Sequence, residues 1–273
     1  MNPNPLSQYF RTPALHVALP SGGKFYPKNA IDLTADNQYP ILPLSRQDEL
    51  IYLSASSQYT SSSIASIITS CVPNIKDVWK MPAIDVDALL VAIKIASQGP
   101  VLEAKTVCTN CETENKTNVD LNQILNQFQA PDYNQPKILQ DLKIYFRPIS
   151  YQQANDNIAA QIGDEDLFDA IDENADDQTR TEKIDLLLAK IRELSTDVLA
   201  KHILYIELPH SRVDNYSHIF EWLSNCDRQI YLQLQQHIVD IKNQTEVKPL
   251  EITCASCGTH YQQSYSLNLA SAA

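Results

Sequence analysis

The sequence predicts an α+β fold in which two β-hairpins hold one zinc ion and a long, mainly helical segment is inserted between the hairpins. Three observations predict this arrangement. Cys108 and Cys111 form one Cys-x-x-Cys motif, and Cys254 and Cys257 form another. Strand-like runs flank each motif. The segment between the motifs is dominated by apolar residues at helical spacing.

The four cysteines have the composition of a structural zinc site. Four thiolates give zinc a closed tetrahedral shell, and soft sulfur ligands favour zinc over hard cations. An ordinary zinc ribbon has its motifs about 15–20 residues apart, whereas well over a hundred residues separate Cys111 from Cys254. We therefore expect one zinc ion per chain to join the ends of an inserted domain. The alternatives are disulfides, a redox pair or unpaired core thiols, although neither motif opens a helix as a redox pair would.

These motifs divide the chain into four predicted regions. Residues 1–13 are polar and rich in proline, and we expect them to form an extended arm. Residues 14–129 form an N-terminal α+β region with the first cysteine hairpin. Residues 130–245 form the mainly helical inserted domain, and residues 246–273 form a C-terminal hairpin with the second cysteine pair.

In the N-terminal region, strands come first and helices follow. A strand is expected at residues 14–19, and a turn-rich loop follows at residues 20–27. Ser45 is the predicted N-cap of a helix that begins at Arg46. The remaining short strands and helices are expected over residues 31–33, 39–44, 61–71 and 85–98.

The inserted region begins with a predicted strand at residues 142–147. Its helices are expected over residues 179–194, 217–225 and 227–243. Residues 164–177 are rich in Asp and Glu, but they lack the central glycine and the alternating acids of a calcium loop. We predict a solvated acidic loop there.

Composition indicates which classes of partner to expect. The 273 residues carry a net charge of −12, whereas nucleic-acid-binding surfaces are usually basic. We therefore expect protein partners and no nucleic acid, with a zinc-ribbon nucleic-acid-binding factor as the alternative function. No apolar run of membrane-spanning length and no secretory pattern occurs, so we expect no membrane association. Six cysteines fit a reducing cytoplasm, with Cys71 and Cys226 as apolar core residues.

The sequence shows no catalytic motif, so we expect no enzymatic activity. None of the six histidines lies in a metalloprotease pattern. Gly22-Gly23-Lys24 does not form a phosphate-binding loop, because Phe25 stands where a Ser or Thr must hold magnesium. His260 lies near the second cysteine pair and is expected at its rim.

The stretches ALPSGGKFYP (18–27), LSRQDE (44–49), SCVPNIKDVW (70–79) and MPAIDVDALLVAI (81–93) occur in the N-terminal half. Together with NCDR (225–228) and the last cysteine hairpin, they resemble the baseplate hub and hub-assembly protein family of T4-like contractile-tailed bacteriophages. The resemblance implies a non-enzymatic structural or assembly protein of the tail baseplate, assembled in the bacterial host cytoplasm and located in the virion. It also implies several copies around the tail axis that contact other tail proteins, such as hub, tube or wedge subunits.

Aromatic residues of the arm and the following loop are candidate partner contacts. Tyr9, Phe10, Phe25 and Tyr26 look exposed in the sequence, and aromatic residues are enriched at interface anchors. Trp79 is predicted to be a core residue or a further anchor. The alternative for Phe25 and Tyr26 is that they cover the local core.

Overall fold

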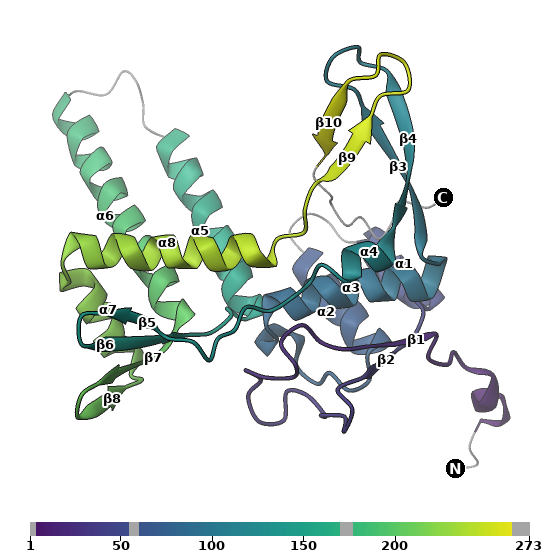
Figure 1. The fold of residues 1–273 in the computed structure, drawn as a ribbon, viewed down its shortest axis with the longest axis horizontal. Coiled ribbons are helices and arrows are strands. Elements are labelled where there is room, and N and C mark those ends of the chain that lie inside the picture. The colour runs from purple at the N-terminus through teal and green to yellow at the C-terminus, as the bar shows by residue number, and fades with distance from the viewer. Residues whose placement is uncertain (1–3, 55–59, 170–176, 264–273) are drawn as a thin grey trace. The chain divides into compact units, whose positions relative to one another are not determined.

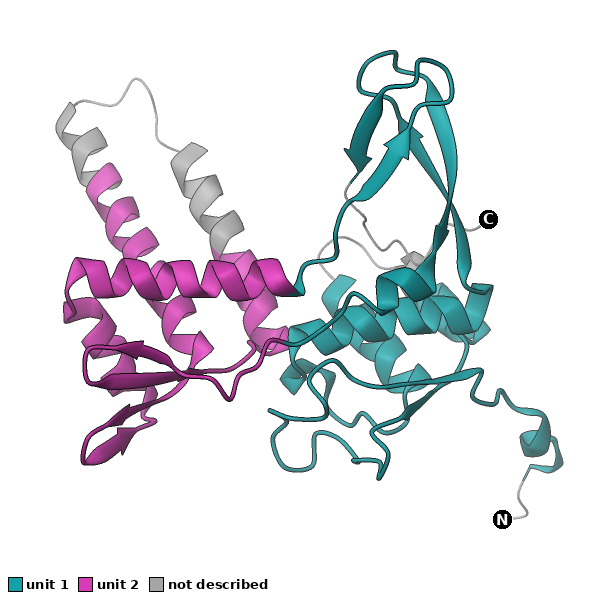
Figure 2. Cartoon of the chain, in the orientation of Figure 1, with its two compact units in different colours: residues 1–130, 245–273 teal, residues 131–244 magenta. Residues whose placement is uncertain are grey.

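The computed structural model describes residues 4–54, 60–169 and 177–263 (Figure 1). The chain forms two compact units, shown in Figure 2. Unit 1 comprises Met1–Ala130 and Thr245–Ala273, and unit 2 comprises Pro131–Gln244. Unit 1 is therefore built from two chain segments that flank unit 2 in the sequence.

The N-terminal part of unit 1 is a helical layer with a small antiparallel sheet. β1 pairs with β2, and Ile41 and Tyr39 of β2 are fully buried. Its elements are η1 (Pro5–Tyr9), β1 (Leu15–Val17), β2 (Tyr39–Ile41), α1 (Arg46–Ser54), α2 (Thr60–Cys71), η3 (Val78–Lys80), α3 (Ala83–Gln98) and α4 (Leu121–Leu125).

α3 is the central helix of unit 1. Nine of its residues are buried, including Leu89 and Ile93, so it is apolar on nearly every side, as expected of a helix inside a core. It ends at Gly99, which has a φ of 89° and whose amide donates to the carbonyl of Ile95. The predicted helix at residues 85–98 is thus present and begins slightly earlier.

The first helix begins as the sequence predicts. The amide of Asp48 donates to Ser45 Oγ over 3.2 Å, and the Ser45 amide donates to Asp48 Oδ2 over 2.7 Å. Each side chain thereby satisfies a backbone N–H group of the helix start, the reciprocal arrangement of a capping box. α1 runs from Arg46 to Ser54.

Two N-terminal expectations need correction. The arm is not wholly extended, because Pro5–Tyr9 forms a short 3-10 helix in which the Asn4 side chain accepts a hydrogen bond from the Leu6 amide. The strand expected at residues 31–33 is reduced to a single bridge between Ile31 and Ile75. The 3-10 helix depends on a side-chain cap and the bridge joins two residues that are distant in the sequence, so residue composition alone specifies neither.

The loop at residues 20–27 is fastened to α3 by a buried carboxylate. Asp85 is fully buried and accepts bonds from the Ser21 amide (2.8 Å), the Ser21 hydroxyl (2.5 Å) and the Tyr26 hydroxyl (2.7 Å). Burial raises the pKa of Asp85, and the three hydrogen bonds oppose that rise. Gly23 suits this loop, because its φ of 72° is a backbone conformation that residues with a side chain rarely adopt.

Two β-hairpins complete unit 1. The strands β3 (Val101–Val107) and β4 (Glu114–Asp120) pair antiparallel, as do β9 (Leu250–Thr253) and β10 (His260–Gln263). Figure 1 shows the two hairpins alongside each other with their turns at the same end. The second hairpin belongs to the C-terminal segment, so unit 1 is complete only when the residues that follow unit 2 in the sequence are included.

In its described residues, unit 2 combines four helices with a four-stranded antiparallel sheet of strand order β5-β6-β7-β8. The buried Ile144 and Phe146 of β6 and Ile206 of β7 form one core with Leu223 and Leu234 from the helices. The elements are β5 (Lys137–Leu139), β6 (Leu142–Phe146), α5 (Tyr151–Asp169), α6 (Asp177–His202), β7 (Ile203–Leu208), β8 (Ser211–Val213), α7 (Tyr216–Asn225) and α8 (Arg228–Thr245).

The sequence predicted only one strand of that sheet, at residues 142–147. β7 follows α6 without a loop and was hidden by the helical pattern before it. The acidic stretch was expected to be a loop, yet α5 continues through Asp169 and α6 begins at Asp177. Residues 170–176 lie outside the described part of the chain. No helix among the described residues has both the length and the apolar character needed to cross a bilayer.

Candidate metal centre

The two cysteine motifs fold into the same type of turn. In the first turn, the Cys108 amide donates to the Thr113 carbonyl over 3.0 Å. In the second, the Cys254 amide donates to the Thr259 carbonyl over 2.9 Å. The residue after each second cysteine is left-handed, with a φ of 56° at Glu112 and 71° at Gly258. Glycine adopts this conformation without steric cost, so the second turn is the less strained of the two.

These turns bring four sulfur atoms together. The sulfurs of Cys108, Cys111, Cys254 and Cys257 all lie within 4.8 Å of one another. Across the hairpins, Cys108 Sγ lies 3.7 Å from Cys257 Sγ and Cys111 Sγ lies 3.6 Å from Cys254 Sγ. All six cysteines of the chain are free thiols, and a disulfide would need sulfurs about 2.05 Å apart.

The sulfur spacing fits a tetrahedral zinc ion. Zinc–sulfur bonds of about 2.3 Å place neighbouring sulfurs about 3.8 Å apart around a tetrahedron. The two distances between the hairpins are close to this value. Cys108 and Cys254 are buried, whereas Cys111 and Cys257 lie nearer the surface. The arrangement therefore suits a structural ion, and four thiolates would leave no open position for a substrate.

Electrostatics also favours a cation at this position. Hydrogen bonds from the hydroxyl and amide of Thr259 lower the pKa of Cys257 to about 5. The amides of Asn110 and Cys111 favour the thiolate of Cys108, but burial and the neighbouring thiols raise the pKa of Cys108 to about 11. Backbone amides of the turns thus favour thiolates at Cys108 and Cys257, while the neighbouring thiols oppose ionisation of Cys108. A divalent cation removes that conflict.

Sequence reasoning missed the polar residues around the sulfurs. Asn115 on β4 is 6 % exposed, and its side-chain Nδ2 lies 3.6 Å from Cys254 Sγ. Asn110 lies 3.8 Å from Cys257 Sγ. Asn110 lies inside the first motif and Asn115 four residues after it, and only these positions could have drawn attention to them. His260 stands outside the cluster, where Nδ1 is 2.9 Å from the Thr253 hydroxyl.

The predicted contact residues occupy different environments. Tyr9 and Phe10 are 77 % and 60 % exposed. Phe25, Tyr26 and Trp79 are half-buried. Tyr26 donates its hydroxyl hydrogen bond to Asp85 within unit 1, and burial together with the Asp85 charge raises the pKa of Tyr26. Of the five residues, Tyr9 and Phe10 present the most side-chain surface.

The β3–β4 hairpin carries more acidic than basic residues. Two ion pairs cross the β3–β4 pair. Lys105 Nζ lies 3.8 Å from Glu114 Oε1, and Lys116 Nζ lies 3.1 Å from Glu103 Oε1. Each lysine therefore faces a carboxylate. A row of uncompensated cations, which a phosphate backbone would require, does not occur on these strands.

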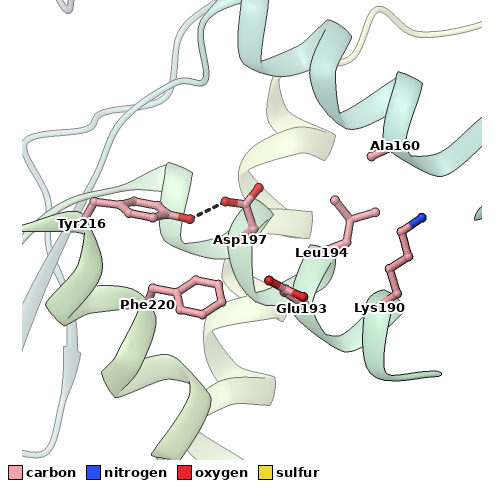
Figure 3. Close-up of a pocket in the computed structure, with 7 residues that line it drawn as sticks. All are labelled: Ala160, Lys190, Glu193, Leu194, Asp197, Tyr216 and Phe220. Atoms are coloured by element: carbon pink, nitrogen blue, oxygen red, sulfur yellow. Dashed lines mark hydrogen bonds between the residues drawn. The ribbon is translucent and has the colours of Figure 1, made fainter. Parts of the chain in front are cut away.

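A separate hollow of about 450 Å³ lies in unit 2 (Figure 3). Tyr216 donates a hydrogen bond to Asp197, whose other oxygen lies 2.6 Å from Lys201 Nζ. The carboxylate is thus already paired. The lining residues are Ala160, Lys190, Glu193, Leu194, Asp197, Tyr216 and Phe220. These seven residues include no cysteine, serine or histidine.

Comparison with known proteins places the chain in a family context. A family model described as "T4 bacteriophage base plate protein" matches residues 12–269, and this range includes all four clustered cysteines. No curated protein and no solved structure matches the chain.

Proposed function

Because this chain belongs to the T4 bacteriophage base plate protein family, we propose that it is a non-enzymatic structural or assembly component of the baseplate hub that carries one structural zinc ion. The family match over residues 12–269 is the observation that carries the proposal. It accounts for a phage tail location and for contacts with other tail proteins.

Zinc has a mechanical role in this proposal. Cys108 and Cys111 lie in the first segment of unit 1, and Cys254 and Cys257 lie in the second segment, which follows unit 2 in the sequence. An ion held by all four thiolates would fasten these segments to each other. Its binding energy becomes folding energy, because the unfolded chain has no such site. The four cysteines are the ligands, and the cofactor acts without chemical turnover.

The N-terminal arm is the proposed contact with a neighbouring tail subunit. None of the residues of η1 is buried, and Leu6 is 62 % exposed. Leu6, Tyr9 and Phe10 thus present apolar surface that the chain does not cover itself. Arg11 fixes the base of the arm by donating to Asp48 over 2.8 Å and to the Pro43 carbonyl over 2.7 Å. An apolar segment on a fixed base suits insertion between subunits of a hub, with several copies around the tail axis.

Phage particles test the proposal directly. Mass spectrometry of purified baseplates should detect the chain, and deletion of its gene should stop baseplate assembly. A Tyr9→Ser/Phe10→Ser chain should stay folded but fail to restore assembly. Ile138→Ser is the matched control, since Ile138 is 65 % exposed but lies in unit 2. Normal baseplates without the chain would refute the function, and full rescue by the double variant would refute the arm contact alone.

A further inference from the structure

Asn115 connects the first cysteine hairpin to the second. Its Oδ1 accepts a hydrogen bond from the Ala255 amide over 3.0 Å. Its Nδ2 lies 3.6 Å from Cys254 Sγ and 3.2 Å from the Tyr261 hydroxyl. Asn115 belongs to β4, whereas these three partners all belong to the C-terminal hairpin or its turn. One buried amide therefore contacts both the backbone and a sulfur of the opposite hairpin.

The orientation of this amide is fixed by its neighbours. The Nδ2 group donates to the Thr113 carbonyl over 3.0 Å, while Oδ1 faces the Ala255 N–H group. Exchanging the two ends would set a donor against a donor and an acceptor against an acceptor. The Nδ2 end of Asn115 therefore faces Cys254, and its two N–H groups are shared among the Thr113 carbonyl, the Tyr261 hydroxyl and the Cys254 sulfur.

Tyr261 holds Asn115 from the other hairpin. Asn115 stands four positions after Cys111, and Tyr261 stands four positions after Cys257, so the two side chains occupy equivalent places in the two turns. The Tyr261 hydroxyl accepts from Asn115 Nδ2 and shares a second hydrogen bond of 2.8 Å with the Thr106 hydroxyl, in which either group can be the donor. Thr106, Asn115 and Tyr261 are each at most 8 % exposed. The result is a buried polar chain across the junction of the hairpins.

Few apolar contacts would hold the junction without this chain. The buried cluster there consists of Cys108, Ile252, Cys254 and Tyr261, with Leu250 packed against it. Two of its four buried members are themselves sulfur ligands of the proposed centre. Correct docking of the hairpins therefore depends on polar contacts to an unusual degree.

We propose that Asn115, held by Tyr261 and Thr106, is the positioning residue of the metal centre. It docks the C-terminal hairpin onto the first hairpin and keeps the Cys254 sulfur in the four-sulfur cluster with N–H groups directed at it. The inference rests on the zinc site proposed above. Residues that orient metal ligands typically change metal affinity by about ten- to a hundredfold when they are replaced, and we expect a loss in this range.

The isosteric variant Asn115→Asp separates this role from simple packing. Aspartate keeps the shape of the side chain and an oxygen for the Ala255 amide, but it replaces the donor to Cys254 with a second acceptor. If Asn115 only filled space, Asn115→Asp would be milder than Asn115→Ala. If Asn115 acts as a donor to the sulfur, Asn115→Asp should be the more damaging of the two. Asn118→Ala is the matched control, because Asn118 lies on the same strand and is exposed.

The experiment uses the full chain, refolded with zinc or cobalt. Zinc affinity is measured by competition with a chromophoric chelator, and cobalt absorption reports the environment of the thiolates. We expect affinity about ten- to a hundredfold below wild type for Asn115→Ala, a larger loss and a shifted cobalt spectrum for Asn115→Asp, and wild-type values for Asn118→Ala.

Each outcome decides one question. A folded wild-type chain that binds no metal overturns the metal centre itself. Metal-loaded wild type with equal affinity and equal spectra in Asn115→Asp overturns only the role of Asn115. If the aspartate variant does not fold, Tyr261→Phe replaces it, since that change removes one hydroxyl from the same polar chain. Wild-type affinity and spectrum in Tyr261→Phe would then overturn the proposal, and weakened affinity would support it.

Discussion

Replacing Asp85 with alanine should loosen the loop at residues 20–27 and destabilise unit 1. Asp85 is 0 % exposed and is the shared acceptor for three donors, two from Ser21 and one from Tyr26. Ser21 is itself 6 % exposed, so its amide cannot turn to solvent once the carboxylate is gone. The predicted result is a buried, unsatisfied N–H group beside a small cavity.

The size of the effect follows from these contacts. A buried polar group without a partner costs about 1–3 kcal/mol. The amide and hydroxyl of the buried Ser21 would both lose their acceptor, which gives about 2–6 kcal/mol, whereas the half-buried Tyr26 is left out of this sum. The wild-type chain also bears the cost of burying a carboxylate, which appears as the raised pKa of Asp85, and alanine relieves that cost. We therefore expect the free energy of unfolding of unit 1 to fall by about 2–4 kcal/mol.

The two tryptophans allow unit 1 to be followed separately. Trp79 lies in unit 1 and Trp222 in unit 2. In a Trp222→Phe background, Trp79 is the remaining tryptophan, and its fluorescence follows the denaturant unfolding of unit 1. Asp32→Ala is the control: Asp32 is an exposed aspartate of unit 1 whose ion pair with Lys76 lies at the surface, and we expect a change within about 0.5 kcal/mol. A loss below about 1 kcal/mol in Asp85→Ala would refute the reasoning, since it would mean that the three donors find other partners.

Three further predictions concern the metal site and the base of the arm. Cys257→Ser should weaken zinc binding by at least about a hundredfold in chelator competition. Cys226 lies outside the cluster, so Cys226→Ser should leave the zinc affinity unchanged. Equal zinc affinities in the two variants would exclude Cys257 as a ligand. Arg11→Ala should lower the free energy of unfolding of unit 1 by about 2 kcal/mol, because it leaves the buried Asp48 carboxylate without its cation. Arg46 forms an exposed ion pair with Glu49, so Arg46→Ala should lower the free energy of unfolding by less than about 0.5 kcal/mol. Similar losses in the two variants would contradict this account. Burial alone would raise the pKa of Asp48, but hydrogen bonds from Ser45 and Ser70 and the charge of Arg11 lower this pKa in the folded chain. The stability that the ionised Asp48 contributes is therefore fully present above the unfolded pKa of about 3.9, and it is lost as the pH falls through the lower pKa of the folded chain. The stability difference between wild type and Asp48→Asn should shrink over that acid range, and a constant difference would exclude Asp48 as the titrating group.

Local sequence signals determined most helices and the turns. The Ser45 cap with Asp48, and the end of α3 at Gly99, depend on residues close together in the chain, where side-chain and backbone preferences act directly. The two Cys-x-x-Cys motifs likewise indicated two thiol-bearing turns. Those parts of the fold were predictable because a few neighbouring residues define them.

The sheet of unit 2 could not be predicted in the same way. β7 begins at Ile203 directly after the last residue of α6, and its partner strand β6 lies some sixty residues earlier. A strand in a buried sheet is stabilised by partners distant in the sequence, so its own residues carry a weaker signal than those of an amphipathic helix. The 3-10 turn in the arm escaped prediction for a different reason, since it depends on a single cap from Asn4.

By itself, the sequence determined the types of ligand atom at the candidate metal centre, because cysteine is chemically distinctive. Only the tertiary structure decided that the four sulfurs lie within 4.8 Å of one another and that Asn115 and Tyr261 meet between the hairpins. Asparagine and tyrosine occur throughout the chain in ordinary positions. Their role depends on the contact between two hairpins that are distant in the sequence, and that contact exists only once the chain has folded.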